Sequence, residues 1–197
     1  MAEDKNTGVR YGISNIHYAL LNEDDGTYGS LKAILGAAKL TLTPKGNSNT
    51  VYYDNVPFES FEANGGYDLS LELANLPDDV LVDLLGYKRD TNGVIYEPVN
   101  VKPVYAALLW QFDGSKIDKR GELFKVKFAR PTEEANTKTD TVNPDNTTLT
   151  GSALAHEVTI GSVKESIVKA SANNSGEQHK AFDAWFTKVY LPGTTLS

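Results

Sequence analysis

The spacing of apolar residues changes within residues 67–86. Across residues 67–73 apolar and polar side chains alternate, which is typical of a strand with one buried face. Across residues 80–85 the apolar side chains recur at helical spacing, while Pro77 suits the first turn of a helix and Gly86 suits its end. The sequence therefore predicts a strand followed by a helix, and nothing in this unit is arranged for catalysis.

Residues 44–66 combine turn formers with aromatic side chains. The segments PKGNSN at 44–49 and NGG at 64–66 are turn clusters, with short aromatic-rich strands between them. We therefore expect a hairpin or extended arm over 44–66. It carries four aromatic residues: Tyr52, Tyr53, Phe58 and Phe61. Rings of this kind favour contact with a partner surface, and the alternative is that they fold back onto the core of their own chain.

Further strands are predicted on both sides of this unit. The run VYAALLWQF at 104–112 is almost wholly apolar, as in a central strand covered on both faces. Residues 122–130 alternate, which places Phe124, Val126 and Phe128 on one inward face. The strand pattern also occurs at 13–21, 37–43 and 154–160, and Asn92-Gly93 predicts a short hairpin.

The C-terminal part of the chain predicts a helix over residues 176–190. Ser175 and Gln178 match a capping box at its start. Large apolar residues then recur at helical spacing: Phe182, Trp185, Phe186 and Val189. Burial of such side chains is favourable, so we expect this helix to dock on the sheet. Residues 132–150 are polar instead, and a mobile loop is expected there.

The chain is expected to form a single mainly β (α+β) domain over residues 1–197, with helices packed on the sheet. Its apolar content of 40% is enough to fill a core. No run of about 18 apolar residues predicts a transmembrane helix, and the N-terminal residues lack the apolar segment of a secretory signal. The chain has no cysteine, which excludes disulfides, thiolate metal sites and a cysteine nucleophile.

The charge balance argues against a protein that grips nucleic acid. Asp and Glu outnumber Lys and Arg by 26 to 19, which gives a net charge of -7. Tight binding to phosphates requires clustered basic residues, and no basic run here exceeds two residues. An acidic protein that does not adhere to DNA fits the composition better.

No group of residues has the spacing of a catalytic or metal site. His17, His156 and His179 are far apart and match no zinc signature. Asp78-Asp79 is explained by the positive end of a helix dipole, and the acidic turn at 23–26 lacks the ligand spacing of a calcium loop. We therefore predict no catalytic residue, no metal site, no cofactor and no enzyme activity.

The order and spacing of four stretches resemble the major tail proteins of long, non-contractile-tailed phages that infect Gram-positive bacteria. The stretches are LPDDVLVDLLGY (76–87), YEPVNVKPVYAALLWQF (96–112), ELFKVKFARPTEEANTKTDT (122–141) and TLTGSALA (148–155). Together they cover most of residues 76–155. No one of them is diagnostic by itself, and the resemblance rests on their order.

This resemblance implies a tail-tube-type β-sandwich or barrel with a packed helix and a long extended loop. It implies hexameric rings that stack into the tail tube, the conduit for DNA ejection, with a loop reaching from one ring to the next. Residues 44–66 are the first candidate for that inter-ring arm, through Tyr52, Tyr53, Phe58 and Phe61, and residues 132–150 are the second.

The same resemblance implies the surroundings of the protein. Its partners would be copies of itself together with the tape-measure, distal-tail and tail-terminator proteins, with no membrane contact. Genomic DNA would be a non-specific partner in transit only. The protein would belong to the virion tail and pass through the host cytoplasm during assembly.

An acidic lumen would repel the DNA duplex, whereas lysine–phosphate contacts would hold it back. Asp68 and Glu72, on the polar side of the predicted strand at 67–73, are the candidate lumen-facing residues. Lys125 and Lys127 are expected either to face outward or to act as cross-strand partners of these two carboxylates.

Two other functions remain open from the sequence. One is a carbohydrate-binding β-sandwich module, with Trp110 beside Tyr96 or Tyr105 as the aromatic platform, although Trp110 lies in the most apolar predicted strand. The other is a tail-terminator or distal-tail protein, which forms a single ring and does not polymerise.

Overall fold

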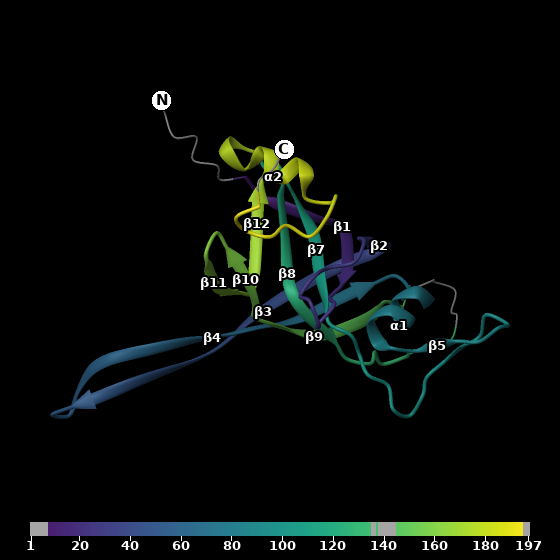
Figure 1. Ribbon diagram of the computed structural model, residues 1–197, viewed down its shortest axis with the longest axis horizontal. Helices are drawn as coiled ribbons and strands as arrows, with labels where there is room; N and C mark the ends of the chain where they lie inside the picture. The colour runs from purple at the N-terminus through teal and green to yellow at the C-terminus, as the bar shows by residue number, and fades with distance from the viewer. Residues whose placement is uncertain (1–7, 135–136, 138–144, 195–197) are drawn as a thin grey trace.

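The computed structural model describes residues 8–134, 137 and 145–194 of the chain, and most of this structure is antiparallel β-sheet, as the sequence predicts (Figure 1). The main sheet contains β1 (Arg10–Leu20), β2 (Lys32–Ile34), β3 (Ala37–Tyr53), β4 (Val56–Leu73), β7 (Ala106–Gly114), β8 (Lys119–Phe128), β9 (Thr147–Leu154) and β12 (Lys169–Asn173). Its strand order is β2-β1-β7-β8-β9-β4-β3. Strand β12 joins the sheet by pairing with β8 and is not part of this order.

Small hairpins and short helices complete the described structure. The hairpins are β5 (Lys88–Arg89) with β6 (Ile95–Tyr96), which the Asn92-Gly93 signal predicts, and β10 (His156–Ile160) with β11 (Val163–Ile167). The helices are α1 (Asp78–Leu85), the 3-10 helix η1 (Gly176–Gln178) and α2 (His179–Ala184). Among the described residues, no helix has the length and apolar character needed to cross a membrane.

Strand β7 supplies buried side chains to both faces of the main sheet. Ala106, Leu108 and Trp110 belong to the hydrophobic cluster that also contains the buried residues of α1. Ala107 and Leu109 belong to a second cluster, on the face covered by residues 181–191, which we call the C-terminal segment. The prediction of a central strand buried on both faces is therefore confirmed.

Helix α1 is tied to the sheet by one carboxylate. The Tyr18 hydroxyl, on a side chain 1% exposed, donates a hydrogen bond of 2.6 Å to Asp83 Oδ2, and Lys32 Nζ lies 2.6 Å from the same oxygen. Burial and the nearby Asp83 raise the pKa of Tyr18 well above its usual range. Asp83 therefore joins α1 to β1 and β2 at a single point.

The paired strands β3 and β4 form an arm that leaves the main sheet as one continuous hairpin (Figure 1). Their register runs from Ala37 opposite Leu73 to Tyr53 opposite Val56. The connecting turn is Asp54-Asn55, whose φ angles of 52° and 64° suit a two-residue hairpin turn. Strand β9 pairs with β4 over residues 67–73, so β3 alone pairs with the outer part of β4.

The expected hairpin over residues 44–66 is confirmed, but its two predicted turns are wrong. Both turn clusters lie within the strands, opposite each other, at a register shift between Lys45 and Gly46. At Gly46 a Cβ would lie 2.4 Å from the Ala63 carbonyl oxygen. Glycine serves here for a close backbone approach at an irregularity in the ladder, and chain reversal occurs at Asp54-Asn55 instead.

The alternation of residues 122–130 predicted that Phe124, Val126 and Phe128 share one face of the sheet. This prediction is wrong for Phe124, which lies on the opposite face. Ala106 pairs with Val126 and Leu108 pairs with Leu123, so β8 holds one extra residue at this point. The irregularity turns Phe124 toward the C-terminal segment, while Val126 and Phe128 remain in the cluster with α1.

The C-terminal helix predicted over 176–190 is shorter than expected and irregular. It consists of η1 and α2 followed by turns, and Ser175 makes no side-chain cap hydrogen bond. Gln178 instead accepts a hydrogen bond of 2.9 Å from the Asn173 backbone N–H of β12. Docking is nevertheless confirmed, because Phe182, Trp185 and Val189 are buried on the sheet.

The loop expected over residues 132–150 is described only in part. Residues 135, 136 and 138–144 lie outside the described residues. Residues 147–150 belong to β9, so the last part of the expected loop is strand.

Glu122 is a buried carboxyl group on the sheet face covered by the C-terminal segment. It is 0% exposed, its Oε2 accepts a hydrogen bond of 3.2 Å from the Tyr190 backbone N–H, and its Oε1 has no partner among the described residues. Burial raises the pKa of Glu122 from 4.5 to about 8. The side chain is therefore mostly protonated in the folded chain at neutral pH.

We expect Asp83→Ala to lower the free energy of unfolding by about 1–3 kcal/mol, because it leaves the buried Tyr18 hydroxyl without its acceptor. Urea unfolding measures this loss. Glu157→Ala is the control, since Glu157 forms an exposed ion pair with Lys164, and solvent screening leaves such surface pairs little net effect on stability. Equal losses in both variants would contradict the assigned role of Asp83.

Glu122 should make the folded chain less stable as the pH rises from about 5 to 8. In this range the folded state retains a proton that the unfolded state releases, because the folded pKa is above the unfolded value. The loss attributable to Glu122 approaches about 1 kcal/mol per pH unit, and Glu122→Gln should remove it. Urea unfolding across this range measures both slopes. Glu157→Gln should keep the wild-type slope, and equal slopes in wild type and Glu122→Gln would contradict the assignment.

Candidate functional site

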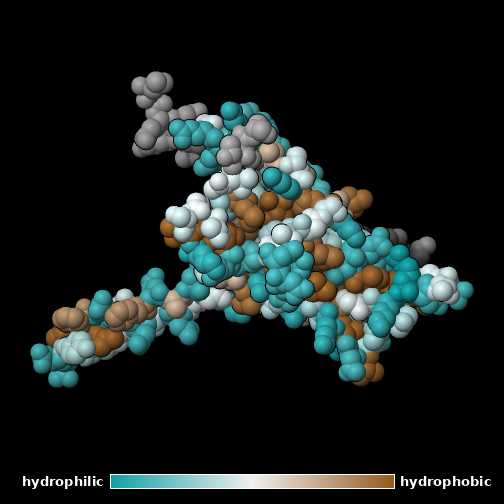
Figure 2. All heavy atoms as spheres, viewed as in Figure 1, coloured by the Kyte–Doolittle hydropathy of each residue, from teal (hydrophilic) through white to brown (hydrophobic). Residues whose placement is uncertain are grey.

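The outer part of the arm has one apolar face that is open to solvent. The register places Asn49 opposite Phe61 and Val51 opposite Glu59. A register shift after Val51 then adds one residue to β4 and places Tyr53 opposite Val56, so these pairs lie on one face of the hairpin. Phe58 joins them, because its ring meets the ring of Tyr53 edge-on at a centroid distance of 5.0 Å. We call the set Val51, Tyr53, Val56, Phe58 and Phe61 the apolar arm face; Figure 2 shows hydrophobic residues along the arm.

The opposite face of the arm is mainly polar. Ser48, Thr50 and Ser60 lie there, with hydroxyl–hydroxyl distances of 3.2 Å from Ser48 to Ser60 and 3.4 Å from Thr50 to Ser60. Tyr52 alternates with Tyr53 along β3 and therefore belongs to this side. The four aromatic residues singled out in the sequence thus divide into three on the apolar arm face and one on the other.

The four rings do not fold back onto the core of their own chain. Tyr52, Tyr53, Phe58 and Phe61 are between 53% and 72% exposed. Val56 at the tip is 60% exposed as well. A contiguous apolar surface of this kind on a protruding hairpin is typical of a surface that binds another protein.

The arm is also acidic over its whole free length. Residues 46–64 contain Asp54, Glu59 and Glu62 and no Lys or Arg, which gives a formal charge of -3. The nearest lysine in β3, Lys45 at the root, is already paired with Asp68 at 3.0 Å. The free part of the arm therefore combines apolar rings with uncompensated negative charge.

The candidate lumen residues Asp68 and Glu72 take their ion-pair partners from β3. Lys45 pairs with Asp68, and Lys39 pairs with Glu72 at 3.3 Å. The expected partners from β8 are engaged elsewhere: Lys125 lies 3.4 Å from Glu23, and both Lys125 and Lys127 lie over the ring of Tyr105. The proposed pairing with the β8 lysines is therefore wrong, while the lumen-facing role of the two carboxylates stays a prediction.

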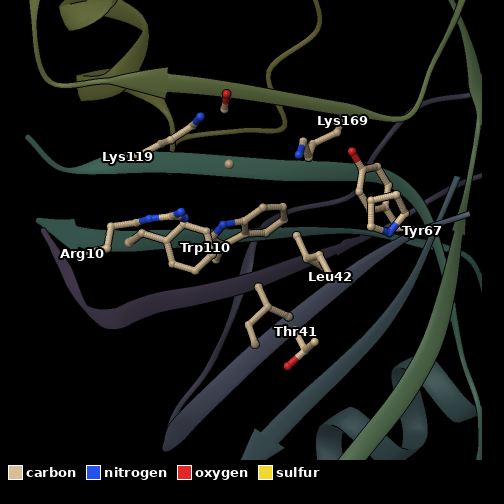
Figure 3. A pocket seen from close by; sticks show the side chains of 12 residues that line it. Arg10, Thr41, Leu42, Tyr67, Trp110, Lys119 and Lys169 are labelled. Atoms are coloured by element: carbon tan, nitrogen blue, oxygen red, sulfur yellow. The ribbon is translucent and has the colours of Figure 1, made fainter. Parts of the chain in front are cut away.

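A cavity of about 450 Å³ opens between β12 and the root of the arm, and Figure 3 shows its lining residues. Three of them are cations, Arg10, Lys119 and Lys169, and the described lining residues include no Asp or Glu. None of the three makes an ion pair within the described part of the chain. We call this site the cationic cavity.

Aromatic side chains form part of the wall of the cationic cavity. The guanidinium of Arg10 lies 4.9 Å from the ring centroid of Phe112, and Lys169 Nζ lies 4.8 Å from that of Tyr67. Trp110 also lines the cavity, and its buried Nε1 has no hydrogen-bond partner among the described residues. The site therefore offers positive charge held against apolar surface.

No pattern in the sequence indicates the cationic cavity. Its cations come from β1, β8 and β12, so they are spread over most of the chain and share no spacing. Trp110 was correctly expected in the core, since it is 2% exposed. No local pattern could have indicated that it also borders a cavity.

The three histidines occupy separate sites with ordinary neighbours. His17 Nδ1 lies 3.0 Å from the Asn15 carbonyl oxygen, and His179 pairs with Asp183 on the surface at 3.5 Å. His156 lies beside Tyr28, and burial together with the charge of Lys125 lowers its pKa. Among the described residues, no group of three or more His, Cys, Asp or Glu side chains is placed to hold a metal ion.

The acidic turn at 23–26 and the pair Asp78-Asp79 make contacts within the chain. Asp25 accepts hydrogen bonds from the backbone N–H and the hydroxyl of Thr27, which lowers the pKa of Asp25 and closes the turn. Asp79 pairs with Arg89 at 2.7 Å. These contacts explain both segments without a ligand.

No protein-family model matches this chain, and no curated protein sequence matches it significantly.

Proposed function

We propose that this chain is a structural virion protein that assembles into hexameric rings, and that the rings stack into a phage tail tube. The apolar arm face is the observation that carries this proposal. Several large apolar side chains are exposed on a hairpin that projects from the sheet (Figures 1 and 2). Burial of this face against another copy would remove its apolar surface from water. The order of the four sequence stretches that resemble major tail proteins supports the same function.

The sheet topology suits assembly through strand edges. β2 and β3 end the main sheet, so each offers backbone groups on its outer side for pairing. Open edges invite uncontrolled association, and a closed ring of subunits would cover them. A contact between two different surfaces closes into a ring by rotation and extends into a tube by translation.

The charge of the chain suits a conduit for DNA. Its net charge of -7 disfavours tight binding of phosphates, so DNA would be a partner only in transit. In this proposal the other partners are the tape-measure, distal-tail and tail-terminator proteins. The protein acts in the virion tail after assembly in the host cytoplasm, and no residue is assigned a catalytic role.

The alternatives receive less support from the structure. A carbohydrate-binding module would need Trp110 to present a ring face to solvent, whereas Trp110 is 2% exposed. A tail-terminator or distal-tail protein would form a single ring. The exposed apolar arm face is better explained by a protein that also stacks.

We expect the purified wild-type protein to form rings and hollow tubes at high concentration. Negative-stain electron microscopy and sedimentation velocity measure this assembly. The double substitution Tyr53→Ser with Phe58→Ser should abolish stacking, because it removes two exposed rings of the apolar arm face without touching the core.

Tyr52→Ser is the matched control, since Tyr52 is equally exposed but lies on the other side of the hairpin. It should reduce stacking less than the double substitution. A wild-type protein that stays monomeric at every concentration, or tubes that form equally well with the double substitution, would contradict the proposal.

A further inference from the structure

We propose that the outer part of the arm of one copy docks in the cationic cavity of a second copy. This inference rests on the proposed function in that it names where the stacking arm binds. The occupant is a second copy of this chain, and its contacting residues are the apolar arm face together with Asp54 at the tip and Glu59 on the same face.

The charges of the two surfaces are complementary. The cationic cavity presents Arg10, Lys119 and Lys169, and the described lining residues include no acidic side chain. The free arm carries three carboxylates and no cation over residues 46–64. Opposite potentials of this kind steer two surfaces together and fix their register.

The apolar parts of the two surfaces match as well. The cavity wall includes Leu40, Leu42 and Phe112, while the arm offers Tyr53 and Phe58 near its tip. A volume of about 450 Å³ lies within the range of pockets that enclose a small-molecule ligand, so it has room for side chains of the arm. The arm can therefore bury rings in the cavity while its carboxylates reach the cations at the rim.

The position of the cavity excludes the tip of the chain's own arm as its occupant. Pro44 and Tyr67 line the cavity and pair with each other at the root of the arm. The tip at Asp54 is nine residues beyond Lys45, so a straight hairpin places it roughly 30 Å away. The tip could reach its own root only if the β3–β4 ladder broke.

The arm tip and the cavity thus lie at opposite ends of one continuous hairpin. A copy whose arm enters a neighbour still has an empty cavity at its own arm root. Such a contact joins two different surfaces, and where it is not reciprocated within a pair it propagates from copy to copy.

Disulfide trapping tests this contact, because the chain has no natural cysteine. A copy with Tyr53→Cys on the arm is mixed with a copy carrying Ser171→Cys, whose side chain lines the cavity. We expect a disulfide-linked pair under mild oxidation, measured on a non-reducing gel. Thr159→Cys is the matched acceptor control, an exposed strand residue of β10 that is not among the cavity-lining residues.

Charge reversal tests the chemistry of the same contact. Lys119→Glu with Lys169→Glu in the acceptor should lower the cross-linking yield roughly tenfold. Glu59→Lys in the donor should restore part of it, whereas Glu62→Lys, on the opposite face of the arm, should not. Equal cross-linking to Thr159→Cys, or a yield unchanged by reversal of the cavity charges, would overturn the inference.

Phosphate addresses the alternative that the cavity holds a small anion. At matched ionic strength, cross-linking should occur in phosphate-free chloride buffer if the arm is the occupant. A cavity that binds phosphate in isothermal titration but gives no cross-link to Tyr53→Cys in the phosphate-free buffer would overturn the arm as the occupant and indicate a small-anion site.

The outcomes separate this inference from the proposed function. Tubes that form without the Tyr53–Ser171 cross-link would leave the tail-tube function standing and reject the cavity as the acceptor. Cross-linked copies from a protein that forms neither rings nor tubes would support the docking contact and reject the tail tube.

Discussion

The pairing of β4 with β9 is the constraint on which the arm depends. A two-stranded hairpin is marginal by itself in water, because it has no core to offset the loss of chain entropy. Here the inner half of β4 lies between β3 and β9, and its side chains Leu69, Leu71 and Leu73 are buried in the main cluster. The free half of the ladder extends from this anchored half, so an otherwise unstable hairpin can project with its apolar rings exposed.

Long periodic patterns in the sequence predicted the elements that lie in the core. The alternation across residues 67–73, the helical spacing across 80–85 and the apolar run at 104–112 correspond to β4, α1 and β7. Burial dictates these patterns, so they are visible locally. The short C-terminal helix was predicted too long because Phe182, Trp185 and Val189 are buried whether or not the backbone stays helical between them.

The other errors share a physical cause, which is that one residue type serves several backbone roles. Gly46 and Gly66 look like turn residues, yet they allow close approach within continuous strands. One extra residue in β8 reverses the face of Phe124, and no periodic pattern in the sequence indicates it.

The cationic cavity could not be predicted, since Arg10, Lys119 and Lys169 meet only after three distant strands align. The exposure of Tyr53 and Phe58 likewise follows from the length of the hairpin, not from their identity.

Gly66 lies where the arm leaves the sheet, one residue beyond Tyr67, the last residue of β4 that pairs with β9. Its φ angle is 91°, its N–H is held by the side chain of Asn64 at 3.0 Å, and a Cβ there would lie 2.0 Å from the Ala153 carbonyl oxygen of β9. The direction in which the arm projects is therefore set at Gly66. With a length of roughly 30 Å, a rotation of about 5° at this point displaces the tip by about 3 Å. The direction of the arm thus depends on the backbone of β9, although the free half of the arm does not pair with this strand.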